Sequence, residues 1–316
     1  MRRGWRRLLL AVLPVALGAA SPPAIADLWF AHNAVTTMLG AADRIRVTVV
    51  SPAAQPWLFR IAPALTHARI VANGSANAET LLADGVNVAF TSGEPEAVRL
   101  RRFGLDARAM SFTDVAGFDR SLRETASVIG TPLARARLAA YERYTGTVVE
   151  RLQGKFGALP EARRPRVLHL VSWSPMKADG AGTMIDQWIR LAGGRNAAVG
   201  LTGNQQPVSI EQVVAWHPDI IIVGGMARGP DDRPWAAEPA LKGIRVVRNP
   251  VGVFPWDRYG PEFALQLQWA AALMHPDVMG HPDLSAQTQR FYRQFYGYNL
   301  SAGDAARILH ALPPAG

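Results

Sequence analysis

The residues of this chain that are most suited to ligand chemistry are aromatic and basic side chains placed just after expected strands. In open α/β sheets, ligands bind beyond the carboxyl ends of the strands. Aromatic faces bind flat or apolar surfaces, whereas guanidinium groups bind anionic ones through paired hydrogen bonds. The expected ligand-binding residues are His32, Trp57, Ser92, Trp173, Met176, Met226, Arg228, Trp235, Trp256, Arg258 and Tyr259.

Packing is an equal alternative for some of these residues. Trp256 and Tyr259 lie in a proline-containing loop before an expected helix, where aromatic side chains often belong to the core. Arg258 has two acidic neighbours, Asp257 and Glu262, and a lone arginine more often pairs with such a carboxylate on the surface than with a ligand. The ligand role of these three residues therefore depends on the fold.

The sequence offers no visible basis for catalysis. It has no Gly-x-Ser-x-Gly elbow and no cysteine, and the GAG at 180–182 lacks the Lys-Ser/Thr pair of a phosphate-binding loop. The seven histidines form no His-x-x-x-His pair, which disfavours capture of a bare zinc or manganese ion. His32 is the exception, because it follows an expected strand and could occupy an open position on a metal. We expect a binding protein and not an enzyme.

The segment 209–225 shows how one of the exit loops is positioned. Ser209 and Gln212 form a capping box that starts a short helix, and Pro218 then breaks the helical pattern. The apolar run Ile220–Val223 follows and ends at two glycines, as expected for a strand buried on both faces. Helix, strand and loop therefore follow one another within this segment.

An earlier segment, 77–93, repeats this order. It has a capping Asn77, then Glu79 in the first turn, and an apolar run that ends in small residues. The spacing from Glu79 to Gly93 equals that from Glu211 to Gly225. Such units are common in α/β proteins, so the spacing alone is weak evidence for two related lobes. Further strands are expected at 28–31, 46–50, 108–112, 166–171 and 244–247.

A long helix is expected between the two series of strands. Thr131 can cap it, and Pro132 suits its first position. Apolar residues then recur at helical spacing as far as Phe156. About 25 residues at roughly 1.5 Å each give about 37 Å, which is enough to reach from one lobe to another. The expected divisions are a signal at 1–26, a first lobe at 27–131, the helix at 132–157 and a second lobe at 158–316.

The first 26 residues predict export. Four arginines precede the apolar run Leu8–Leu17, and Ala24-Ile25-Ala26 fits a cleavage site after Ala26, by either the general secretory or the twin-arginine route. The net charge of +9 comes without a cluster of basic and aromatic residues, so we do not expect nucleic-acid binding. The absence of cysteine excludes disulfides, thiolate metal sites and a lipid-anchored cysteine. These features indicate a periplasmic protein that diffuses freely.

Several segments resemble one family. The segments LAGGRNAA at 191–198, VSIEQVVAWHPDIIIVGG at 208–225, ALQLQWAAALMHPD at 264–277 and FYGYNLSAGDAARIL at 295–309 are similar to the periplasmic binding proteins of ABC importers for iron complexes and vitamin B12. LGAADRI at 39–45 and NAETLLADGVNVAF at 77–90 extend the resemblance to the first lobe. The family's usual Ser-Pro loop after the first strand is replaced here by LWFAHNAVTTML.

The resemblance implies a fold, a ligand and a partner. The fold is α/β, with two Rossmann-like lobes joined by a single long rigid α-helix, as in class III binding proteins with a helical backbone. The ligand between the lobes is a metal chelate, with a ferric siderophore expected first and cobalamin, haem or a nickel or cobalt complex as alternatives. No covalent cofactor is implied. An enzyme on the same two-lobed scaffold is the alternative from another class.

Glu79 and Glu211 match the two glutamates with which this family docks onto arginines of the membrane permease. The resemblance therefore implies an ABC permease dimer in the inner membrane as the partner of a monomeric binding protein. Another interpretation is that both carboxylates only complement helix N-termini, an effect of roughly 0.3–1 kcal/mol each. The two interpretations are compatible.

Overall fold

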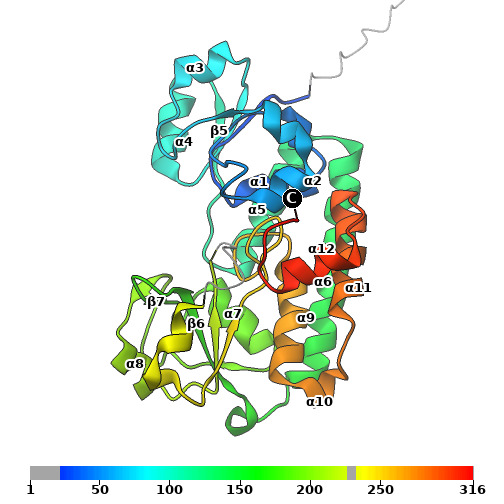
Figure 1. Cartoon of the computed structure of the whole chain (residues 1–316). Helices are drawn as coiled ribbons and strands as arrows, with labels where there is room; N and C mark the ends of the chain where they lie inside the picture. The colour runs from blue at the N-terminus through cyan, green and yellow to red at the C-terminus, as the bar shows by residue number, and fades with distance from the viewer. Residues whose placement is uncertain (1–21, 226–232, 316) are drawn as a thin grey trace, which may run out of the picture.

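The computed structural model describes residues 22–225 and 233–315. Figure 1 shows two α/β lobes with a group of helices along one side. The first lobe contains a parallel five-stranded sheet ordered β3-β2-β1-β4-β5. Its strands are β1 (Ile25–Asp27), β2 (Ile45–Thr48), β3 (Arg69–Ile70), β4 (Val88–Thr91) and β5 (Asp106–Ala109), and its helices include α1 (His32–Met38), α2 (Pro56–Ile61), α3 (Ala78–Ala83) and α4 (Glu94–Arg101).

The second lobe contains a mixed sheet ordered β11-β10-β6-β7-β9, with β8 paired to β6. Pairs β6–β7 and β7–β9 are antiparallel, whereas β10 is parallel to both β6 and β11. The elements are β6 (Arg166–Ser172), β7 (Lys177–Ala178), α7 (Met184–Leu191), β8 (Arg195–Asn196), β9 (Gln206–Pro207), α8 (Ile210–Ala215), β10 (Ile220–Val223), the 3-10 turns η4 (Pro234–Ala237) and η5 (Pro239–Leu241), and β11 (Arg245–Arg248).

The strand expected at 28–31 is wrong, because the first strand lies earlier. β1 pairs with both β2 and β4 at the centre of the sheet, and Ile25 and Ala26 are fully buried. The polar Asp27 ends this strand, where its carboxylate accepts a hydrogen bond from Thr36 Oγ1 at 2.7 Å. Cleavage after Ala26 would remove two of the three residues of β1, and the position of cleavage stays a prediction.

Both predicted helix starts of the repeated segments are confirmed. The Asn77 side chain accepts a hydrogen bond from the N–H of Thr80 at the start of α3. Ser209 and Gln212 form the complete capping box of α8. The strand that follows, β10, is fully buried between β6 and β11, as its apolar sequence requires.

The long helix α6 (Pro132–Phe156) joins the two lobes, and Thr131 caps it. Its buried face includes Tyr141, whose hydroxyl donates to the carbonyl oxygen of Pro261 at 2.8 Å. Helices α5 (Val115–Ile129) and α9 (Phe263–Met274) pack against it. The predicted fold class of two α/β lobes joined by a long helix is confirmed.

The end of the chain makes a second connection between the lobes. After α10 (Pro276–Met279), α11 (Leu284–Phe291), the π-helical turn Tyr292–Tyr296 and α12 (Ala302–Leu309), the chain returns to the first lobe. There Trp57 Nε1 donates to the carbonyl oxygen of Leu312, and Arg60 donates to that of Ala315, both at 2.9 Å. Figure 1 shows this terminus beside α1 and α2.

Among the described residues, no helix combines the length and the apolar character needed to cross a bilayer.

Candidate functional site

A pocket of about 230 Å³ lies at the carboxyl ends of β6, β10 and β11 in the second lobe. This is where an open sheet with parallel strands normally presents its ligand site. We call it the strand-exit pocket. It is lined by Val171, Ser172, Trp173, Ser174, Val223, Gly224, Gly225, Pro234, Trp235 and Arg248.

Two tryptophans and an arginine form the recognition surface of the strand-exit pocket. The rings of Trp173 and Trp235 meet edge to face, with centroids 6.4 Å apart. The guanidinium carbon of Arg248 lies 5.1 Å from the centroid of the Trp235 ring. Stacking on an aromatic face orients the planar guanidinium group. The surface therefore suits a ligand with both flat or apolar and anionic parts.

The floor of the strand-exit pocket requires glycine at position 224. A Cβ atom there would lie 2.3 Å from Oδ2 of Asp257 and 2.8 Å from Nε2 of His169. Real Cβ atoms do not approach other atoms so closely, and both neighbours are held in a buried network. The backbone at the end of β10 is therefore in direct contact with the side chains of Asp257 and His169.

The network beneath Gly224 pairs His169 with two carboxylates. Nδ1 of His169 lies 2.8 Å from Asp179, and Nε2 lies 2.7 Å from Asp257. Nη2 of Arg258 donates to Asp179 at 3.0 Å. Arg258 and His169 share the same two partners, Asp179 and Asp257, so the two positive and two negative charges balance one another when His169 is protonated.

The protonation states of the network follow from these contacts. Burial disfavours the charged ring of His169, but its hydrogen bonds to Asp179 and Asp257 outweigh burial and raise its pKa. Burial would raise the pKa of Asp179, yet His169 and Arg258 lower it below the ordinary range. Burial would likewise raise the pKa of Asp257, but the charge of Arg258 outweighs burial and lowers it. The network is therefore ionised and holds the loop after β11 in place.

That loop, residues 249–261, also contacts the first lobe. The centroid of the Tyr259 ring lies 5.7 Å from that of Trp29 and 5.5 Å from that of Phe112. The ring centroids of Phe254 and Phe30 are 5.8 Å apart. Aromatic pairs at such distances are favourable contacts. The loop therefore links the floor of the strand-exit pocket to the junction between the lobes.

Glu262 anchors the loop from its far end. Its buried carboxylate accepts hydrogen bonds from the N–H groups of Val253 at 2.8 Å and Phe254 at 3.0 Å, and from the hydroxyl of Tyr292. Burial raises the pKa of Glu262 to about 7 in spite of these bonds. Glu262 therefore supports the loop 249–261, which we call the interlobe loop, with a carboxyl group that titrates near neutral pH.

The expected ligand-binding residues are only partly brought together. Trp173 and Trp235 line the strand-exit pocket, and Met176 packs half-buried on the same core cluster as Trp173. Ser92 is half-buried just after β4, in the other lobe. Met226 and Arg228 lie outside the described residues.

Two of the expected residues belong instead to the loop and its network. Tyr259 is half-buried at the lobe junction. Arg258 is paired with Asp179 and Asp257, as the alternative to a ligand role proposed, but it is buried and not on the surface. Its pairing partner Asp257 was one of the two neighbours named from the sequence, whereas Asp179 is distant in the chain.

Three expected residues are buried in the core and do not line the strand-exit pocket, so their role as ligand contacts stays a prediction. His32 is fully buried in α1, with Nδ1 3.0 Å from Asp27 and Nε2 2.8 Å from Thr125. Trp57 is fully buried in α2, and Trp256 is 1% exposed. The helices α1 and α2 begin where the sequence indicated loops, and for this reason His32 and Trp57 lie in the core. Within the described parts of the chain, no group of three or more His, Cys, Asp or Glu side chains is arranged to hold a metal ion.

Arg248 is a pocket residue that the sequence reasoning missed. The strand was expected to end at residue 247, whereas Arg248 is the last residue of β11. The signal was present, because a basic residue that ends an apolar strand lies at the carboxyl edge of the sheet. His169 and Asp179 were also missed, since only the fold brings them together with Asp257.

The two family-matched glutamates lie on the surface. Glu79 is in the first turn of α3 and Glu211 in the first turn of α8, and both are exposed. Figure 1 shows α3 in one lobe and α8 in the other, both on the side of the molecule away from α6. The hydrogen bond with Ser209 lowers the pKa of Glu211, so it is anionic at neutral pH.

Comparisons with known proteins agree with this architecture. The sequence is similar to the molybdate-binding protein MolA of Haemophilus influenzae, with 30% identity over 136 residues, which are 40% of this chain and 38% of that protein. A periplasmic solute binding protein from Veillonella parvula has a similar structure, with a TM-score of 0.74, 24% identity and coverage of 92% of each chain. The structure of MolA bound to molybdate gives a TM-score of 0.71 and 21% identity over 89% of this chain and 96% of MolA.

The match to a family model covers more of the chain than the sequence match to MolA. Residues 70–250 match the model of the periplasmic binding proteins, which is more than half of the sequence. This range includes β10 and both exposed glutamates, as well as the whole of α6. The chain therefore belongs to the periplasmic binding protein family.

Proposed function

We propose that this protein is the substrate-binding component of an ABC importer and that it captures a metal chelate between its lobes. The observation that carries the proposal is the surface of Trp173, Trp235 and Arg248 at the carboxyl ends of three strands. A ferric siderophore is the first candidate for the ligand. Cobalamin, haem and a nickel or cobalt complex are the other candidates of the same class.

The chemistry of the strand-exit pocket favours an organic chelate over a bare oxyanion. Molybdate is the ligand named for MolA, and a small tetrahedral anion needs hydrogen-bond donors and positive charge. Such an anion has no flat or apolar face for Trp173 and Trp235 to cover. A chelate offers both parts, because its organic shell lies on the indole rings and its anionic groups meet Arg248.

Tryptophan fluorescence tests this proposal. Purified mature protein is titrated with a ferric tris-hydroxamate, cobalamin, haem, a nickel complex and molybdate. We expect a chelate to quench with the highest affinity and Arg248→Ala to raise its Kd about 10- to 100-fold, since a hydrogen bond to a charged group is worth about 1.5–3 kcal/mol.

A matched control is available on the same strand. Arg245 begins β11 and is exposed, so Arg245→Ala should leave the Kd unchanged. Molybdate binding in preference to every chelate would contradict the proposed ligand class. Equal affinities of the wild type and Arg248→Ala would show that the strand-exit pocket is not the ligand site.

Glu79 and Glu211 are proposed as the contacts with the permease. Each carboxylate stands on the first turn of a capped helix, one in each lobe, and a two-fold symmetric partner can meet both at once. Replacement of both by alanine should abolish uptake in cells and leave the ligand Kd unchanged. The same replacement of the exposed Glu150 and Glu161 is the control. Intact uptake by the Glu79→Ala/Glu211→Ala protein would refute the docking role.

A further inference from the structure

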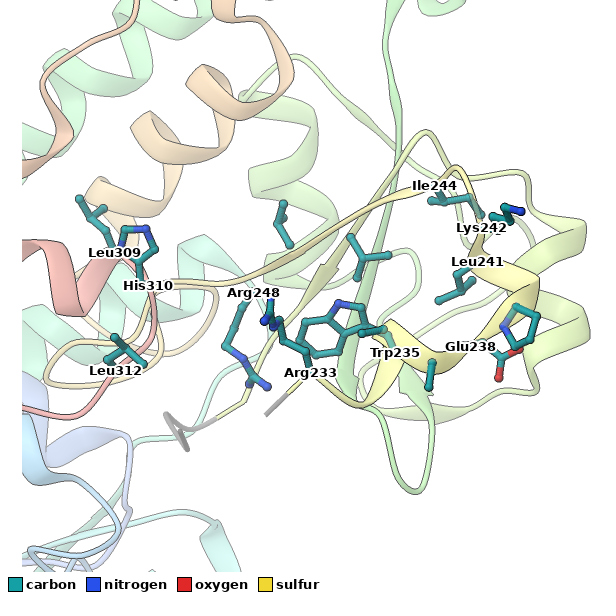
Figure 2. A pocket seen from close by; sticks show the side chains of 15 residues that line it. Arg233, Trp235, Glu238, Leu241, Lys242, Ile244, Arg248, Leu309, His310 and Leu312 are labelled. Atoms are coloured by element: carbon teal, nitrogen blue, oxygen red, sulfur yellow. The ribbon is translucent and has the colours of Figure 1, made fainter. Parts of the chain in front are cut away.

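A larger hollow lies next to the strand-exit pocket, along the outer edge of β11. Its volume is about 930 Å³, and we call it the β11 groove. Figure 2 shows it extending from the segment with Leu309 and Leu312, past Trp235, to Leu241 and Ile244. β11 ends the order of strands in its sheet, so the described residues provide no strand on this side.

The β11 groove combines an apolar wall with a positive charge. Trp235, Leu241, Ile244 and Leu312 supply apolar surface. Arg233, Lys242 and Arg248 also line it, together with His310 and, among the residues that the structure describes, a single carboxylate, that of Glu238. The exposed Arg233 and Lys242 have no carboxylate within ion-pair distance among the described residues. An anionic group near Arg233 and Lys242 would thus meet two positive charges.

The edge of β11 also offers backbone hydrogen bonds to the groove. The N–H of Asn249 donates to the carbonyl oxygen of Val223 on β10. Successive residues of a strand point their backbone groups to opposite edges, so the N–H and C=O of Val246 point away from β10. Val246 lines the groove, where an amide of a bound molecule can reach these groups.

The β11 groove and the strand-exit pocket share Trp235 and Arg248. A molecule held by these two residues can therefore extend from one hollow into the other. The strand-exit pocket alone, at about 230 Å³, is smaller than the roughly 300–1,000 Å³ typical of sites for organic ligands. The groove adds the missing volume.

We propose that the β11 groove binds an extended arm of the ligand, apolar along its length and ending in an anionic group. This inference rests on the proposed function, because it assigns the metal-bearing part of the chelate to the strand-exit pocket. The ligand class is then an amphiphilic chelate, with the arm on Trp235, Leu241 and Ile244 and its anionic end near Lys242. A compact oxyanion would leave the groove unused.

The first part of the test probes the groove without any metal. Anilinonaphthalene sulfonate carries two aromatic parts and one anionic group, and its fluorescence rises in an apolar site. Ala237→Glu and Lys242→Glu change exposed residues that line the groove but not the strand-exit pocket. Each should raise the Kd of the dye at least tenfold. Ala162→Glu and Lys155→Glu are matched controls at exposed positions outside the groove and should leave it unchanged.

The second part compares two ferric tris-hydroxamate chelates, one with a six-carbon arm that ends in a carboxylate and one without it. We expect the arm to lower the Kd for the wild-type protein at least tenfold, and Ala237→Glu to abolish this gain without weakening the armless chelate. Equal affinity of the wild type for the two chelates would overturn the inference and leave the proposed function intact. Dye binding in the groove without binding of either chelate would instead overturn the proposed function.

Discussion

The buried carboxylate of Glu262 makes stability depend on pH in a way that one substitution should remove. Glu262 supports the interlobe loop through the N–H groups of Val253 and Phe254, and through the hydroxyl of Tyr292. Glu262→Gln keeps the size of the side chain and fixes it in a neutral form. The substitution therefore separates the charge of Glu262 from its position.

The magnitude follows from the pKa of Glu262, which burial raises from 4.5 to about 7. Each pKa unit corresponds to about 1.36 kcal/mol, so the difference amounts to about 3 kcal/mol. The raised pKa means that the folded state favours the protonated form. The resulting stabilisation is complete below pH 4.5 and is lost as the pH rises through 7. The free energy of unfolding of the wild type should fall by about 3 kcal/mol over this range because of Glu262.

Urea denaturation followed by tryptophan fluorescence between pH 4.5 and 7.5 measures this effect. The difference in unfolding free energy between the wild type and Glu262→Gln should change by about 3 kcal/mol across the range. Glu150→Gln, at an exposed position on α6, is the control and should follow the wild type. Parallel pH profiles of the wild type and Glu262→Gln would refute the reasoning.

Three further predictions concern the network and the connection between the lobes. Gly224→Ala places a Cβ against Asp257 and should lower the unfolding free energy by about 1–3 kcal/mol in denaturant titrations, whereas unchanged stability would show that the floor can move. Arg258→Ala leaves Asp179 without its guanidinium partner and should cost about 3–5 kcal/mol in the same assay, and a loss below 1 kcal/mol would contradict the ionised network. Small-angle scattering with and without a bound chelate should show only a small closure, because α6 and the terminal segment after α12 both connect the lobes, and a wide hinge rotation would contradict this.

The elements that sequence reasoning predicted well carry strong local signals. The helix α6 begins with Thr131 and Pro132, and α8 begins with a capping box, so short-range hydrogen bonds determine both starts. The run Ile220–Val223 is apolar throughout, which suits only a strand buried on both faces. Each of these features depends on neighbouring residues alone.

The elements that were missed depend on contacts between distant parts of the chain. β1 is a three-residue strand that contains an aspartate, and only its pairing with β2 and β4 identifies it. His32 resembled an exposed loop residue, yet Thr125 in α5 binds one of its ring nitrogens. The partners of His169 come from two separate segments, around Asp179 and Asp257. No local pattern could have revealed these partners.

The most direct test of the proposed function is to identify what the protein carries when it is purified from the compartment to which it is exported. Native mass spectrometry and metal analysis of the same sample give the mass and the metal content of the bound molecule. We predict one metal ion per protein, iron first, together with the added mass of an organic chelator that denaturation releases. A bound molybdate ion without any organic component, or an organic molecule without a metal, would contradict the account.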